Sequence, residues 1–237
     1  MIVAGFILLF IVFLAFMIYA SYSIESGIYI KAFCRMRTND RIVALTFDDG
    51  PDNIQTPKVL DVLKDYNVRA TFFCIGSKVK GNEAIIQRMI SEGHTIGNHS
   101  YTHKGIFPLY STQRVIKELE QCNIELENVS HKRINWFRPP FGVTNPTIAK
   151  AVKKLGYITI GWNIRSLDTQ SLSHKKILHR INRRLRPGSI ILLHDRMPRS
   201  EILVKCLLDE LRIKQYRVIG LGDMVNTHYI EPSTTKR

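Results

Sequence analysis

The feature that most constrains the fold of this chain is a repeated alternation of short apolar runs and longer amphipathic segments. The apolar runs have the length and composition of buried strands, whereas the segments between them place residues such as Val59, Leu60 and Leu63 on one helical face. The predicted strands are 42–47, 70–75, 95–98, 135–137, 157–162, 189–193 and 216–220. Because each parallel strand needs a crossover to reach the next, this alternation predicts an α/β fold with a parallel sheet or barrel.

The N-terminal segment differs from the rest of the chain. Residues 2–20 carry no charge and are rich in Ile, Leu, Phe and Val, and a bilayer needs ~20 apolar residues. A signal peptide cut after Ala20 and a buried core helix are the alternatives, but the run is longer than a signal core and no Lys or Arg precedes it. We expect an uncleaved transmembrane anchor within residues 1–24, followed by a linker over 25–39.

The strand pattern begins near residue 40 and continues to about residue 225, which predicts one domain followed by a polar tail over 226–237. The formal net charge of +14 favours anionic neighbours, either lipid headgroups or an anionic glycan. No motif for nucleic acid stands out, so we expect no nucleic-acid partner. The four cysteines show no CxxC pairing; buried free thiols are the preferred interpretation, and a disulfide in an oxidising compartment stays open.

Three short segments carry side chains that can bind a divalent metal ion. Segment 46–51 reads TFDDGP, segment 99–103 reads HSYTH, and segment 138–142 reads RPPFG. One carboxylate with two imidazoles four residues apart is a ligand set that leaves coordination positions open for water and substrate. The second carboxylate of the DD pair can then serve as a general base. The pattern predicts metal-assisted hydrolysis.

These segments resemble the polysaccharide deacetylases, the NodB-homology domain of carbohydrate esterase family four. The first family motif, TFDDGP, is present without change, and the second, HSxxH or HTxxH, is matched by His99 and His103. The third, RxPY, has Phe141 in place of Tyr, and a later Leu-x-His motif occurs at 192–194. The match covers residues 40–222. The resemblance implies a distorted (β/α) barrel of about seven parallel strands.

The resemblance implies a metal site made by Asp49, His99 and His103. Imidazole nitrogen and carboxylate oxygen suit Zn²⁺, although Co²⁺, Ni²⁺ or Mn²⁺ could occupy the same set. The metal would polarise the acetyl carbonyl and lower the pKa of a bound water.

The resemblance also implies roles for groups around this metal. Asp48 would be the general base, Arg138 would pair with it, and His194 would be the general acid that protonates the leaving amine. The backbone N–H of Phe141 would help to bind the oxyanion. Leu192 and Trp162 would line the acetate pocket or serve only as core.

One segment departs from the family pattern. The fourth motif usually reads DxxDW, whereas residues 165–169 read RSLDT, so Arg165 replaces the leading acid and Thr169 replaces the Trp. Asp168 is the acid that remains. We expect it to support His194, with a turn or helix-cap role as the alternative.

The predicted function is metal-dependent hydrolysis of N-acetyl groups on amino sugars of an envelope polysaccharide, such as peptidoglycan or a chitooligosaccharide-like N-acetylglucosamine polymer. An O-deacetylase of the acetylxylan-esterase kind and a non-catalytic carbohydrate-binding module are the alternatives. The expected partners are the acetylated glycan and the membrane. The resemblance favours an extracytoplasmic domain, although Lys31, Arg35 and Arg37 after the apolar run would alone favour the cytoplasmic side. The sequence does not give the oligomeric state.

Overall fold

The computed structural model describes residues 2–170 and 172–230. Its strands are β1 (Ile42–Asp48), β2 (Thr71–Cys74), β3 (Thr95–Asn98), β4 (Trp136–Phe137), β5 (Ile158–Thr159), β6 (Ile164–Arg165), β7 (Ser189–His194) and β8 (Arg217–Val218). Its α-helices are α1 (Ile2–Tyr22), α2 (Gln55–Asp65), α3 (Glu83–Ser91), α4 (Thr112–Ser130), α5 (Pro146–Leu155), α6 (His174–Arg184), α7 (Ser200–Ile213) and α8 (Leu221–Ile230). Four 3₁₀ turns are η1 (Ile24–Ser26), η2 (Gly76–Lys78), η3 (Phe107–Leu109) and η4 (Pro140–Gly142).

The strands form one parallel sheet in the order β5-β4-β3-β2-β1-β7-β6, with β8 also paired to β1. Every residue of the central strand β1 is buried, as expected for a parallel strand covered on both faces. The α/β barrel-like fold is therefore confirmed. Strand β6 was not predicted, because its two residues belong to no apolar run and are ordered by pairing with β7, which is distant in the chain.

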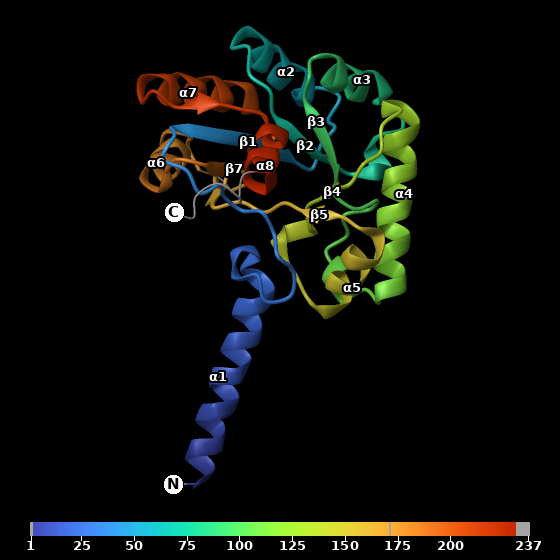
Figure 1. Cartoon of the computed structure of the whole chain (residues 1–237), viewed down its shortest axis with the longest axis vertical. Coiled ribbons are helices and arrows are strands. Elements are labelled where there is room, and N and C mark those ends of the chain that lie inside the picture. The colour runs from blue at the N-terminus through green and yellow to red at the C-terminus, as the bar shows by residue number, and fades with distance from the viewer. Residues whose placement is uncertain (1, 171, 231–237) are drawn as a thin grey trace.

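Two layers cover the sheet. Helices α2, α3 and α7 cover one face of the sheet (Figure 1). They contribute the buried side chains Leu60, Met89 and Leu207 to the core on that face. Helix α8 and a segment near the N-terminus cover the other face, where Met224 and Phe33 join the core. The expected tail over 226–237 begins inside α8, and residues 231–237 lie outside the described part of the chain. All four cysteines are free thiols; Cys74 and Cys122 are buried as expected, whereas Cys34 and Cys206 are only half-buried.

Helix α1 projects away from the domain as a single rod (Figure 1). It is long and apolar enough to cross a membrane, and Ala20 is its only buried residue among those described. The segment expected to be a linker packs onto the domain: the Phe33 N–H donates to the Thr159 carbonyl oxygen at 2.9 Å, and the Met36 N–H donates to the Gly188 carbonyl oxygen at 2.9 Å. The exact boundaries of anchor, linker and domain stay predictions.

Candidate active site

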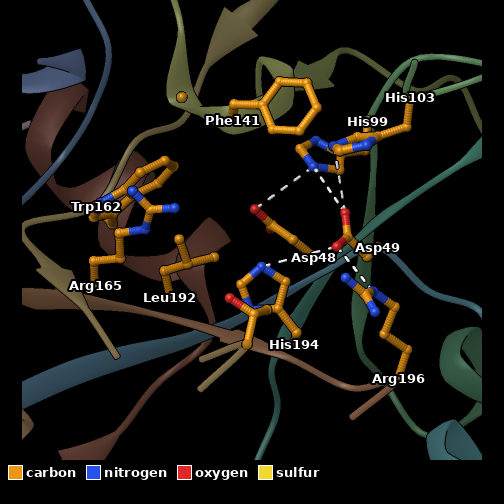
Figure 2. A pocket seen from close by; sticks show the side chains of 12 residues that line it. Asp48, Asp49, His99, His103, Phe141, Trp162, Arg165, Leu192, His194 and Arg196 are labelled. Atoms are coloured by element: carbon orange, nitrogen blue, oxygen red, sulfur yellow. Dashed lines mark hydrogen bonds and ion pairs between the residues drawn. The ribbon is translucent and has the colours of Figure 1, made fainter. Parts of the chain in front are cut away.

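The residues of the separate motifs meet at the carboxyl ends of the parallel strands. Asp48 ends β1, His99 follows β3, Arg138 follows β4, and His194 ends β7. Asp48 and His194 are direct register partners across the β1–β7 pair. The side chains of Asp48, Asp49, His99 and His194 point toward one another in Figure 2. Residues up to about 146 positions apart in sequence thus share one site, as the strand topology requires.

Asp49, His99 and His103 form a compact set of possible metal ligands. One donor atom from each lies within 4.8 Å of the others. The Asp49 Oδ1 atom is 3.6 Å from His99 Nε2 and 3.4 Å from His103 Nε2. A site with three protein ligands fits a divalent cation that keeps positions for water and substrate.

The protonation states of these ligands also fit a metal. His99 Nδ1 lies 2.8 Å from the Arg138 carbonyl oxygen, which can only accept, so Nδ1 carries the proton and Nε2 presents its lone pair. Burial, helped by the charge of His99, lowers the pKa of His103 to about 4, so that this imidazole is neutral near pH 7. Burial would raise the pKa of Asp49, but the hydrogen bond and charge of His99, with the charges of His103 and His194, hold it well below its usual range whenever these imidazoles are protonated.

The backbone is unusual at several of these positions. Asp49, His103 and Phe141 have φ angles of 73°, 49° and 61°, in the left-handed region that residues with a Cβ rarely occupy. Such conformations cost of order 1–3 kcal/mol each and persist only where the surroundings enforce them. The fold therefore aims these three side chains at the site against their local preference.

Arg138 holds Asp48 in a fully buried ion pair. Its Nη1 atom donates to Asp48 Oδ1 at 2.7 Å and to Thr46 Oγ1 at 2.8 Å. The other nitrogens donate to backbone carbonyls at Ile160 and Gly161. A buried guanidinium with each of its three nitrogens bonded cannot turn away, so the Asp48 side chain is held in one orientation.

Asp168 bonds His194 twice. Its Oδ1 atom lies 2.8 Å from His194 Nδ1, and its Oδ2 atom accepts from the His194 backbone N–H at 2.7 Å. Burial lowers the pKa of His194, but the hydrogen bond and charge of Asp168, with the charges of Asp48 and Asp49, raise it overall. The side chain of Ser166 also donates to Asp168, which positions it. This geometry supports the predicted role of Asp168, and the role itself stays a prediction.

A cavity of about 290 Å³ opens over these groups and is large enough for part of one sugar ring. Phe141, Trp162 and Leu192 line it together with Arg165 (Figure 2). Gly142 lies so close to Trp162 that a Cβ there would approach the indole Cη2 within 2.4 Å. Glycine at this position therefore lets Trp162 form the wall.

Two site-adjacent residues were not predicted. Arg196 donates from Nε to Asp49 Oδ2 at 2.9 Å, and its side chain is 39% exposed. Asp195 is fully buried beside Gly50, where a Cβ would meet its carboxylate. Burial raises the pKa of Asp195 to about 7, although the hydrogen bond that the Thr56 hydroxyl donates to it acts in the opposite direction. The one sequence signal that could have indicated these two residues is their position directly after His194.

The chain is similar to known polysaccharide deacetylases. The family described as polysaccharide deacetylase matches residues 35–160, more than half of the chain. The chain is 38% identical over 198 residues to the peptidoglycan-N-acetylmuramic acid deacetylase PdaA of Bacillus subtilis, covering 82% of this chain and 75% of PdaA. It is 34% identical over 196 residues to a peptidoglycan-N-acetylglucosamine deacetylase of Bacillus cereus, covering 79% of this chain and 89% of that protein.

Solved structures show the same architecture. The structure of PdaA, a family 4 carbohydrate esterase, superposes with a TM-score of 0.75 at 33% identity, covering 86% of this chain and 87% of that one. A CE4-family pseudoenzyme from Bacillus anthracis superposes with a TM-score of 0.76 at 26% identity, covering 82% and 69%. The fold and the four motifs, three of them carried by the matched region, show that the chain belongs to the polysaccharide deacetylase family, which includes the amide-hydrolysing deacetylases of Bacillus subtilis and Bacillus cereus named above.

Proposed function

We propose that this protein is a metal-dependent deacetylase that removes N-acetyl groups from amino sugars of peptidoglycan. The observation that carries the proposal is the convergence of a ligand set, a base and an acid on one cavity. Asp48, Asp49, His99, His103 and His194 all line it. Relatives that act on peptidoglycan N-acetylglucosamine and N-acetylmuramic acid support this substrate class.

In this proposal the carboxylate of Asp48 takes a proton from the attacking water, because the hydrogen bond from Arg138 aims it into the cavity. His194, whose pKa is raised by the hydrogen bond and charge of Asp168 against the opposing effect of burial, gives a proton to the amine as the carbon–nitrogen bond breaks. The backbone N–H of Phe141 stabilises the oxyanion, and Leu192 with Trp162 encloses the acetyl methyl group.

Asp49, His99 and His103 would hold the metal. When bound, the metal supplies Lewis-acid polarisation of the acetyl carbonyl and a water of lowered pKa. Zn²⁺ is our first choice because of the mixed nitrogen and oxygen ligands, and Co²⁺, Ni²⁺ and Mn²⁺ are the alternatives.

Two cations on the cavity wall favour an anionic sugar. Arg165 and Arg196 both line the cavity, and Arg165 is exposed. A guanidinium binds a carboxylate through two parallel hydrogen bonds, and N-acetylmuramic acid carries such a carboxylate on its lactyl group. We therefore favour a sugar next to or bearing a lactyl carboxylate over a neutral chitooligosaccharide.

The N-terminal helix α1 would anchor the domain in a membrane, with the domain on the extracytoplasmic side where peptidoglycan lies. Its 21 residues carry no charge and only Ala20 is buried. A cleaved signal sequence has the same features at this position. Intact mass of the protein extracted from membranes separates the two, since cleavage would remove about the whole helix.

Acetate release with and without a strong chelator tests the proposed reaction. Purified full chain in detergent should release acetate from peptidoglycan fragments, lose this activity on dialysis against the chelator, and regain it with Zn²⁺ or Co²⁺. Release from acetylated xylan but not from peptidoglycan would indicate the O-deacetylase. Absence of release from any glycan by metal-loaded protein, with retained glycan binding, would indicate a binding module and contradict the proposal.

A further inference from the structure

The last turn of α1 is fastened to the catalytic domain. The Thr144 N–H donates to the Ser21 carbonyl oxygen at 2.9 Å, and the Thr144 hydroxyl donates to the Ala20 carbonyl oxygen at 3.3 Å. Ala20 and Ile24 are buried. The helix therefore enters the domain as a docked element, and its direction fixes where the domain sits relative to any bilayer that the helix crosses.

The turn η3 lies beside this junction. The Asn145 side-chain amide donates to the Pro108 carbonyl oxygen at 2.7 Å, and Asn145 directly follows the residue that bonds the end of α1. The Tyr29 hydroxyl lies 3.5 Å from the sulfur of Met17 in α1, and Tyr29 packs against the core that contains Phe107 of η3. The domain therefore contacts α1 as far as Met17, five residues before the end of the helix at Tyr22. This is a length of ~8 Å at 1.5 Å per residue.

Large apolar side chains project into solvent around the junction. Leu109 is 84% exposed, Tyr22 is 72%, Ile106 is 54% and Ile28 is 42%. We call these four residues the exit patch. Exposed cations flank it in sequence, since Lys104 precedes Ile106 and Lys31 follows Ile28. Apolar side chains with neighbouring lysines match the boundary between acyl chains and anionic headgroups.

We propose that the exit patch docks on the bilayer that α1 crosses and holds the active site at the bilayer surface. The 21 residues of α1 span ~31 Å, close to the ~30 Å of a hydrocarbon core, so that the junction at Ser21 lies at the interface. Side chains beside that junction then meet lipid. In Figure 1, α1 leaves the domain at the lower side, where α5 also lies. This inference rests on the proposed anchor and on the proposed deacetylase activity.

Docking brings the cavity close to the membrane. Ile106 is three residues after the metal-ligand candidate His103, and Thr144 is three residues after Phe141 of the cavity wall. Three residues span at most ~11 Å, so the cavity wall lies within that distance of groups at the interface. The substrate accepted best is therefore an acetylated glycan held at the bilayer surface by a lipid, in preference to polymer far from the membrane.

Quenching by brominated lipids tests the docking. The full chain, reconstituted into phosphatidylethanolamine and phosphatidylglycerol vesicles with brominated acyl chains, would be compared with its Leu109→Trp and Ile213→Trp variants. Ile213 is 80% exposed, and it ends α7, which Figure 1 places on the side of the domain away from α1. We expect the added tryptophan to be quenched several-fold more in Leu109→Trp than in Ile213→Trp. Equal quenching would overturn the docking.

A second experiment separates the docking from the reaction itself. Leu109→Asp should leave acetate release from a soluble chitooligosaccharide unchanged, and should reduce several-fold the release from an N-acetylglucosamine oligomer tethered to lipid in the same vesicles. Equal reduction on both substrates, or no reduction on either, would overturn the placement of the cavity at the membrane. Absence of activity in the wild-type chain on both substrates would instead contradict the proposed deacetylase, and the quenching result would still decide the docking.

Discussion

The two adjacent carboxylates Asp48 and Asp49 are each paired with an arginine, but the two pairs differ in burial and in the number of bonds. Arg138 is completely buried and donates to Asp48, to a threonine hydroxyl and to two backbone carbonyls. Arg196 is 39% exposed and makes one bond, to Asp49. Buried charges are costly to leave unpaired, whereas exposed pairs contribute little. The comparison indicates that the proposed base has a permanent partner and the proposed metal ligand has a replaceable one.

The largest expected effect is on turnover in Asp48→Asn. Asparagine nearly matches the shape of aspartate and can still accept the bond from Arg138, but it cannot take a proton from water. General-base assistance is typically worth ~10²–10⁴ in rate, and we expect kcat to fall by that factor. Zn²⁺ stoichiometry should stay unchanged, because Asp49, His99 and His103 are intact. A variant within a few-fold of wild type would show that Asp48 is not the base.

Arg138→Gln should cause the largest loss of stability. The substitution leaves the Asp48 carboxylate buried without its counter-ion, and breaking one side of a buried pair costs roughly 3–5 kcal/mol. Denaturant unfolding of the metal-free protein measures this loss, and activity should fall with it. A loss of unfolding free energy below ~1 kcal/mol would show that the buried Arg138–Asp48 pair contributes no more than the exposed Arg196–Asp49 pair.

Asp168→Asn should shift the pH dependence of turnover. The Asp168 carboxylate is one cause of the raised pKa of His194, and the proposed acid must be protonated to act. Removal of that charge lowers the pKa, so that the basic limb of the pH–rate profile moves to lower pH and turnover near neutral pH falls. Arg165→Ala, which removes a cation from the lining of the same cavity, is the control and should move this limb upward or leave it in place. An unchanged pH–rate profile in Asp168→Asn would contradict the proposed support of His194 and would indicate that Asp168 has only a structural role in its turn.

The smallest effect is expected for Arg196→Gln, the counterpart of Arg138→Gln. An exposed pair is worth roughly 0–1 kcal/mol, so the unfolding free energy should change by no more than that. Release of the Asp49 carboxylate from a cation should favour metal binding, and competition with a chromophoric chelator should show several-fold tighter Zn²⁺ affinity. Weaker affinity would mean that Arg196 positions Asp49 for the metal instead of competing with it.

Much of the site could be predicted from the sequence, because its chemistry is concentrated in short motifs that follow apolar runs. TFDDGP, HSYTH and RPPFG each lie at the end of a predicted strand, and the carboxyl ends of parallel strands meet at one edge. Placement of Asp48, Asp49, His99 and Arg138 therefore followed from local pattern and a general rule of topology. Strand β6 and the contact of Arg196 with Asp49 did not, because each depends on neighbours far away in the chain.

The sequence by itself determined the α/β class, the ligand and base candidates, and an apolar N-terminal helix, since these depend on residue type and short-range spacing. Tertiary structure alone decided that Asp168 bonds the ring Nδ1 and the backbone N–H of His194, that Arg138 is fully buried, and that Thr144 fastens the end of α1. The physical reason is that hydrogen bonds and burial depend on three-dimensional distance. Segments 26 to 124 residues apart in sequence meet in these contacts, and no local pattern encodes which groups will face each other.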